Sequence, residues 1–179
     1  RQLQGGMGTQ TAALSIGGAQ PPASAITEQW DGTSWTTVNT LNTARQGGTG
    51  AGTTNSALWS GGYATFTNCE SWDGTSWTEV NDMNTARFYS GGAGAFTSAL
   101  VFGGFPPGAP GNALTESWNG TSWTEVGDLV TKRSNWAASS TGGTASAAMG
   151  AGGTDGPTIL AVTEEWNDPS YVVKTVTTS

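Results

Sequence analysis

A six-residue stretch, Trp-Asp-Gly-Thr-Ser-Trp, recurs along this chain and constrains its fold more than any other feature. Identical copies begin at Trp30 and Trp72, and a copy with Asn in place of Asp begins at Trp118. A degenerate copy begins at Trp166, so that the leading tryptophans lie 42, 46 and 48 residues apart. A period of this length is typical of proteins built from repeated structural units. The sequence therefore predicts four repeats, which comprise residues 1–44, 45–86, 87–132 and 133–179.

Each unit carries the same signals in the same order. An arginine opens it, and a glycine-rich stretch and a short apolar run that ends in Gly-Gly follow. After a loop of variable sequence comes a Glu-x-Trp run, which in the first three units is followed by an Asp-Gly or Asn-Gly turn and a Ser-Trp-Thr-x-Val run. Short runs rich in Thr, Val and aromatic residues are typical of strands, and Asp-Gly or Asn-Gly between two such runs is typical of a hairpin. We predict an all-β protein with four strands, A to D, in each unit.

This combination of elements resembles the kelch repeat. The resemblance covers all four units and implies a β-propeller, whose blades are four-stranded antiparallel sheets packed around a channel. Two alternatives remain open for closure: a self-contained ring of four blades, or the last four blades of a larger propeller. We favour the larger propeller, because the chain begins in frame at Arg1 without Met and its last unit resembles a terminal repeat.

The glutamate of each Glu-x-Trp run shares a strand face with the tryptophan two residues later. A carboxylate buried between blades is costly unless it is paired, and only the opening arginines supply one basic residue to every unit. We therefore expect structural contacts between Glu28, Glu70, Glu116 and Glu164 and the arginines Arg1, Arg45, Arg87 and Arg133. The tryptophans are expected to pack blade against blade; those of the repeated stretch are Trp30, Trp35, Trp72, Trp77, Trp118, Trp123 and Trp166.

Residue composition disfavours several classes of function. The chain has no histidine, and its single cysteine, Cys69, stands where the other units carry threonine. A zinc site is not expected. The copper site that galactose oxidase carries on a kelch-like propeller needs His and Tyr ligands, and this chain has no His and only three Tyr, none of them in a shared motif. The formal net charge of −7 disfavours a nucleic-acid partner, and no apolar run is long enough to span a membrane. We therefore expect no metal, no cofactor and no enzymatic activity.

The loops between strands B and C differ most between units, whereas the C–D turns hardly change. A rigid scaffold that carries divergent loops on one face is a common arrangement for binding sites, although unconstrained loops also diverge. If the loops bind, the candidate contact residues are Pro21, Pro22, Tyr63, Phe66, Phe105, Pro106, Pro107 and Ile159. Phe88, Tyr89 and Trp136 are expected to fill the core or the channel.

These features favour a non-enzymatic structural or binding module. The near-duplicate repeats and the composition resemble kelch-like repeats in bacteriophage virion proteins, which implies a tail fibre, spike or other surface component that functions in assembly or host recognition. The expected partners are other virion or surface proteins, a host glycan or receptor, and a further copy of the chain in a homo-oligomer; the expected location is the virion or the extracellular space. The alternative is a secreted or cell-surface bacterial propeller that binds carbohydrate or mediates adhesion.

Overall fold

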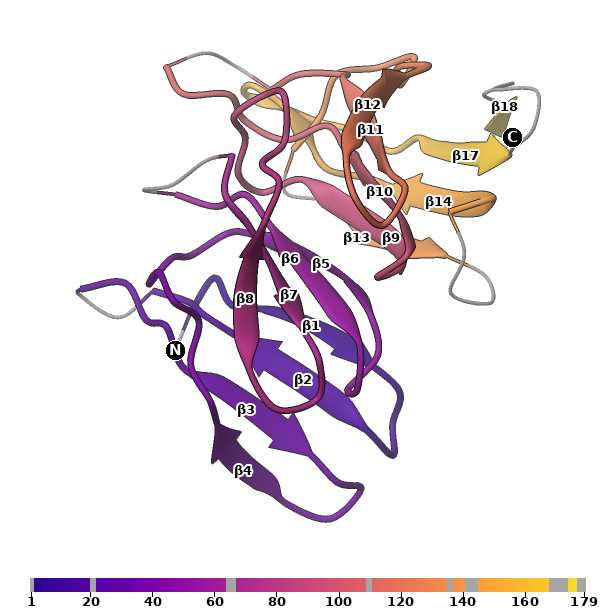
Figure 1. Cartoon of the computed structure of the whole chain (residues 1–179). Helices are drawn as coiled ribbons and strands as arrows, with labels where there is room; N and C mark the ends of the chain where they lie inside the picture. The colour runs from indigo at the N-terminus through magenta and orange to yellow at the C-terminus, as the bar shows by residue number, and fades with distance from the viewer. Residues whose placement is uncertain are drawn as a thin grey trace.

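The computed structural model describes residues 2–19, 22–63, 67–108, 111–134, 137–140, 145–167 and 174–176. These residues contain strands, turns and isolated bridges and no helix, so the fold is all-β as predicted. They form four antiparallel four-stranded sheets and one two-stranded hairpin. Figure 1 shows the sheets in chain order, from the indigo first sheet to the orange and yellow fourth sheet.

Each sheet lies within one of the predicted units. The first sheet contains β1 (Gly5–Gly8), β2 (Ala13–Ile16), β3 (Thr27–Trp30) and β4 (Trp35–Val38). The second contains β5 (Thr49–Gly52), β6 (Ala57–Ser60), β7 (Cys69–Trp72) and β8 (Trp77–Val80). The third contains β9 (Gly91–Ala95), β10 (Ser98–Phe102), β11 (Thr115–Trp118) and β12 (Trp123–Val126). The fourth contains β13 (Ala137–Ser140), β14 (Ala147–Ala151), β17 (Thr163–Asn167) and β18 (Lys174–Val176).

In the first three sheets every strand pairs with the next strand in the chain, which is the predicted A-to-D order. The fourth sheet differs, because its B–C segment forms a small hairpin of its own. This hairpin consists of β15 (Thr154–Asp155) and β16 (Thr158–Ile159) and lies between β14 and β17 in the chain. The sequence predicts a loop here, and the structure instead contains a short hairpin.

The repeated six-residue stretch forms the C–D hairpin. In the second sheet, the Oδ1 atom of Asp73 accepts hydrogen bonds of 2.8 Å from the backbone N–H groups of Thr75 and Ser76. Gly74 lies at φ +94°, a conformation that glycine adopts without strain. Asn119 of the third sheet accepts the same two bonds, so the Asp-to-Asn exchange preserves the turn.

The two tryptophans of the stretch have different partners. The first, on strand C, binds the A–B turn of its own sheet: the Trp72 indole N–H donates to the Thr54 carbonyl at 2.9 Å. The second, on strand D, reaches the preceding sheet: the Trp77 indole N–H donates to Thr27 Oγ1 at 3.0 Å. In the third sheet, Trp123 likewise donates to the carbonyl of Asn81 in the preceding unit. In the second and third sheets, the stretch therefore holds the sheet together and joins it to the preceding one.

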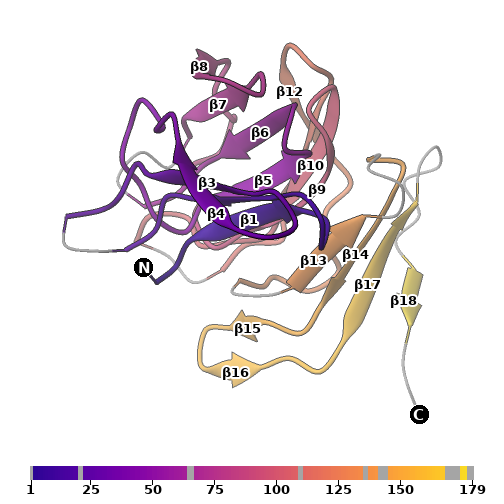
Figure 2. The same cartoon turned by 90° about the horizontal axis from the view of Figure 1, so that it is seen from below.

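Consecutive sheets pack face to face, and each contact contains a separate hydrophobic core. The first interface joins Leu14, Ile16 and Leu41 to Trp59, Trp72 and Trp77. The second joins Leu58, Cys69 and Met83 to Val101, Trp118 and Trp123, and the third joins Leu100 and Phe102 to Ala145 and Ala148. The innermost strands contact one another in the order β1, β5, β9 and β13, which can be followed in Figure 2.

Close packing of these inner strands explains why strand A is rich in glycine. A Cβ atom on Gly5 would lie 2.1 Å from the ring of Trp59, and one on Gly50 would lie 2.1 Å from the methyl group of Met7. Only glycine leaves room for the side chains of the adjacent sheet at these positions.

Among the described residues, no sheet covers the outer face of the first or of the fourth sheet. Trp35 is 50% exposed, whereas its equivalents Trp77 and Trp123 are 5% and 7% exposed. The expectation that every tryptophan of the repeated stretch packs between sheets is therefore wrong for Trp35, because no described sheet lies in front of β4. On the fourth sheet Met149 is 46% exposed, whereas its equivalent Leu14 is 1% exposed beneath the second sheet.

Candidate binding surface

Four aromatic side chains gather where strands B end and strands A begin in the second and third units. The Phe88 ring lies 5.6 Å from the rings of both Tyr63 and Phe105 and 4.9 Å from the ring of Tyr89, measured between centroids. The rings of Tyr89 and Phe105 are 6.4 Å apart. These separations and the mostly edge-to-face geometry are those of favourable aromatic contacts. We call these four residues the aromatic cluster.

Backbone hydrogen bonds hold the aromatic cluster in place. Phe88 and Phe105 form an isolated antiparallel bridge, with N–H···O distances of 3.0 and 2.8 Å. The N–H of Tyr63 donates to the Gln46 carbonyl at 2.7 Å, and the N–H of Tyr89 donates to the Gly47 carbonyl at the same distance. The cluster thus joins the Gly-Gly ends of two B strands to the residues that follow Arg45 and Arg87.

Tyr89 adopts an uncommon backbone conformation, with φ +54°. A non-glycine residue with positive φ persists only where its surroundings hold it there. The ring of Tyr89 lies over Gly47, where an added Cβ atom would come within 2.5 Å of Cε1. Glycine at position 47 therefore permits this ring position.

The cluster combines apolar rings with accessible hydroxyl groups. Tyr63 is 52% exposed, while Phe88, Tyr89 and Phe105 are half-buried. A tyrosine hydroxyl is protonated at neutral pH and can donate a hydrogen bond, and burial raises the pKa of the Tyr89 hydroxyl further above its ordinary value. Such a surface can stack on the apolar face of a ligand and form hydrogen bonds with polar groups at the edge of that ligand.

The structure places the predicted contact residues in different environments. Ring contacts join Tyr63 to Phe105 through Phe88, and Pro106 and Pro107 directly follow Phe105. Pro22 is exposed in the first unit, and Ile159, which is 83% exposed, lies on β16 of the fourth unit. Pro21 and Phe66, like Arg1 and Trp136, lie outside the described residues.

Sequence reasoning missed two members of this cluster. The sequence predicts that Phe88 and Tyr89 fill the core or the channel, but neither is fully buried; Phe88 packs on Tyr63 and Phe105, and Tyr89 packs on Phe88 and Phe105. They follow Arg87 directly, where the second unit has Gln46 and Gly47. This difference between units was the signal available in the sequence.

The expected glutamate–arginine contacts are present in three units. The NH2 nitrogen of Arg45 lies 3.0 Å from Glu70 Oε1, and that of Arg87 lies 2.6 Å from Glu116 Oε1. Arg133 pairs with Glu164 in the same way. All of these side chains are almost completely buried. Burial lowers the pKa values of the Arg45 and Arg87 guanidinium groups, and the paired carboxylates oppose this effect.

Each carboxylate also binds the loop that connects two sheets. Glu70 accepts hydrogen bonds from the backbone N–H and the side-chain amide of Asn42 at 2.8 and 3.0 Å. Asn84 binds Glu116 in the same way, at 2.7 and 2.9 Å. The repeated Asn-Thr-Ala-Arg sequence at 42–45 and 84–87 signals this arrangement, which the sequence analysis did not use. Because these carboxylates are enclosed and hydrogen-bonded by loop and arginine donors, the sites are suited to a structural role and not to acid–base catalysis.

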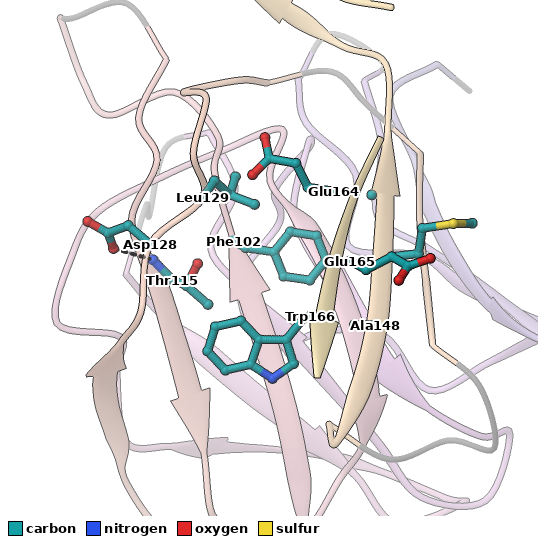
Figure 3. A pocket seen from close by; sticks show the side chains of 10 residues that line it. Phe102, Thr115, Asp128, Leu129, Ala148, Glu164, Glu165 and Trp166 are labelled. Atoms are coloured by element: carbon teal, nitrogen blue, oxygen red, sulfur yellow. Dashed lines mark hydrogen bonds between the residues drawn. The ribbon is translucent and has the colours of Figure 1, made fainter. Parts of the chain in front are cut away.

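A small cavity lies between the third and fourth sheets, lined by Phe102, Leu129, Ala148, Glu164 and Trp166 among others (Figure 3). The fourth unit has Gly150 where the second has Trp59, so that less side-chain volume fills this interface. The cavity volume is about 20 Å³, which is enough for one water molecule and too small for an organic ligand. It is a packing gap between sheets.

Among the described residues, no three His, Cys, Asp or Glu side chains lie close enough together to hold a metal ion. The same part of the chain contains no helix that is long and apolar enough to cross a membrane. No protein-family model matches the chain, and no curated protein matches it either.

Proposed function

We propose that the four sheets are blades of a kelch-like β-propeller, and that the protein is a non-enzymatic binding module. Support for the architecture comes from four-stranded sheets that repeat in chain order, pack face to face and place their first strands together. The observation that carries the binding proposal is the aromatic cluster, which exposes Tyr63 on a backbone held by hydrogen bonds.

The ligand class that best fits this surface is carbohydrate. Sugar rings have apolar faces that pack on aromatic side chains, and their hydroxyl groups bind tyrosine hydroxyls. The net charge of −7 disfavours polyanionic ligands such as nucleic acid. The biological setting that we propose is a virion surface component, such as a tail fibre or spike, that contacts host glycans outside the cell. A secreted bacterial adhesion protein has the same ligand chemistry and remains the second candidate.

A glycan array with the purified chain tests the binding proposal. We expect selective binding to a small group of glycans, and a loss of at least about 10-fold in affinity for Tyr63→Ala and Phe105→Ala, since each removes a stacking surface. Val130→Ala is the control, because Val130 is 67% exposed and is not part of the cluster. Unchanged glycan binding by both cluster variants, with circular dichroism spectra like that of the wild type, would refute the assignment.

Binding to intact bacterial cells separates the two settings. A host-recognition component is expected to bind a narrow set of strains, with binding blocked by the glycan identified on the array. An adhesion protein is expected to bind the same glycan on surfaces of many origins.

A further inference from the structure

Every sheet presents two different faces to its neighbours. One face carries the paired tryptophans, such as Trp72 and Trp77, and packs on the sheet before it; we call it the leading face. The opposite face carries the apolar B-strand residues Leu14 and Ile16 together with Val38, and packs on the sheet after it; we call it the trailing face. Each internal interface therefore joins a trailing face to the leading face of the next sheet.

Within the part of the chain that the structure describes, one face of each kind has no sheet packed on it. The leading face of the first sheet exposes Trp35 and borders an open groove of about 710 Å³ that is also lined by Ala13, Ser15 and Glu28. The trailing face of the fourth sheet exposes Met149, at the position of Leu14, Leu58 and Leu100 in the other sheets. Those three leucines are each only 1% exposed, since a following sheet covers them.

We propose that these two faces bind each other between two copies of the chain. The fourth sheet of one copy would then cover the first sheet of the next in the same way as each sheet covers its successor within the chain. The occupant of the groove is a second copy because the fourth sheet reproduces the elements that bind a leading face. Thr163 pairs in register with Val176, as Thr27 pairs with Val38, and Met149 replaces leucine.

A hydrogen bond across the interface between the first two sheets predicts an equivalent bond between two copies. Trp77 donates its indole N–H to Thr27 Oγ1 across the first internal interface. Trp35 occupies the position of Trp77, and Thr163 occupies the position of Thr27. In the assembly, the Trp35 indole N–H therefore donates to Thr163 Oγ1 of the second copy.

The contact is head-to-tail, because the two faces differ. Such an interface leaves a free face at each end of a dimer and continues until a ring closes or an open chain grows. This property distinguishes the proposal from a symmetric dimer that joins two identical faces.

Analytical ultracentrifugation over a concentration series tests the proposal with four proteins and one mixture. The wild type is expected to form concentration-dependent species larger than a monomer. Trp35→Glu on the leading face and Met149→Glu on the trailing face are each expected to weaken self-association by roughly 30-fold or more, since each places a charge in a desolvated contact. Thr124→Glu adds the same charge to an exposed position of an internal sheet and is expected to assemble like the wild type.

The mixture is decisive for the head-to-tail arrangement. Trp35→Glu retains an intact trailing face and Met149→Glu retains an intact leading face, so an equimolar mixture is expected to form a one-to-one heterodimer that does not grow further. A symmetric interface predicts no complex in the mixture that the separate variants lack, and that result overturns the proposal. A wild type that stays monomeric throughout the series also overturns it, and shows that a second copy does not cover the two faces. Thermal unfolding of each variant establishes that it is folded.

Discussion

The Arg45 guanidinium lies 3.0 Å from the Glu70 carboxylate, and the two side chains are 0% and 1% exposed. The carboxylate also accepts hydrogen bonds from Asn42, which belongs to the loop that enters the second sheet. Buried charges are tolerated in a protein only when they are paired and hydrogen-bonded, as both are here. The pair therefore holds the loop between the first and second sheets against the second sheet.

Replacing Glu70 by Gln is expected to destabilise the protein by about 3–5 kcal/mol, because it leaves the buried Arg45 charge without its counter-ion. The measurement is the free energy of unfolding in urea. Glu79→Gln is the matched control, because Glu79 pairs with Glu70 across β7 and β8 but is exposed. It is expected to change stability by less than about 0.5 kcal/mol. Equal losses of unfolding free energy in the two variants would show that the buried pair does not stabilise this connection between the sheets.

Trp77→Ala is expected to cost about 3–5 kcal/mol, because it empties part of the core between the first two sheets and removes the bond to Thr27. Trp35→Ala removes the same residue from the same hairpin position and is expected to cost much less at low protein concentration, since Trp35 is already half exposed. Thermal or urea unfolding compares the two variants directly. Similar losses would show that the hairpin itself, and not the inter-sheet contact, requires the second tryptophan.

Because of Asp31 and Asp73, the protein is expected to lose stability in acid. Hydrogen bonds from the backbone of the turn, those of Ser34 and Ser76 above all, hold the pKa of each carboxyl below its ordinary value. Their contribution is therefore present above the unfolded-state pKa of about 3.9, and it is lost as the pH falls through the lower folded-state values.

The double variant Asp31→Asn, Asp73→Asn is expected to remove this part of the acid dependence and to keep the turn, because Asn119 already forms the same two bonds in the third sheet. Unfolding midpoints measured from pH 2 to 7 provide the comparison, with both proteins in the same buffers. A double variant whose stability falls as steeply as that of the wild type below pH 4 would exclude these two carboxyl groups as the cause.

Cys69 is expected to be unreactive in the folded protein. Its side chain is fully buried, and this burial raises the pKa of the thiol, so little thiolate forms and reagents cannot reach it. Labelling with a chromogenic disulfide at pH 8 is expected to proceed only as fast as the protein unfolds, and to be complete in denaturant. The double variant Cys69→Thr, Thr124→Cys places the thiol on an exposed strand position and is expected to react at once. Rapid labelling of the wild type without denaturant would contradict the buried position.

The strand order and the C–D hairpins could be predicted from the sequence, because they depend on short-range patterns. The glutamate–arginine pairs join residues far apart in the chain, and they could be predicted because each repeat carries one such arginine and a buried carboxylate needs a partner. Alternation along a strand places Glu70 and Trp72 on one face, and Asp73-Gly74 favours a turn wherever it occurs. The aromatic cluster was only partly predicted. Tyr63 and Phe105 were identified from their variable loops, but Phe88 and Tyr89 belong to a different part of the unit. Only the packing of two neighbouring sheets brings these four rings together.

The two identical copies of Trp-Asp-Gly-Thr-Ser-Trp separate what the sequence determined from what the tertiary structure decided. By itself the stretch determined the repeat length and the same hairpin in both units, in which Asp31 and Asp73 accept the same bonds from the backbone of the turn. The sequence of the stretch did not determine burial, because Trp35 is 50% exposed and Trp77 is 5% exposed. Burial depends on whether a neighbouring sheet covers the residue, and the first sheet covers Trp77 while no described sheet covers Trp35 in the same way.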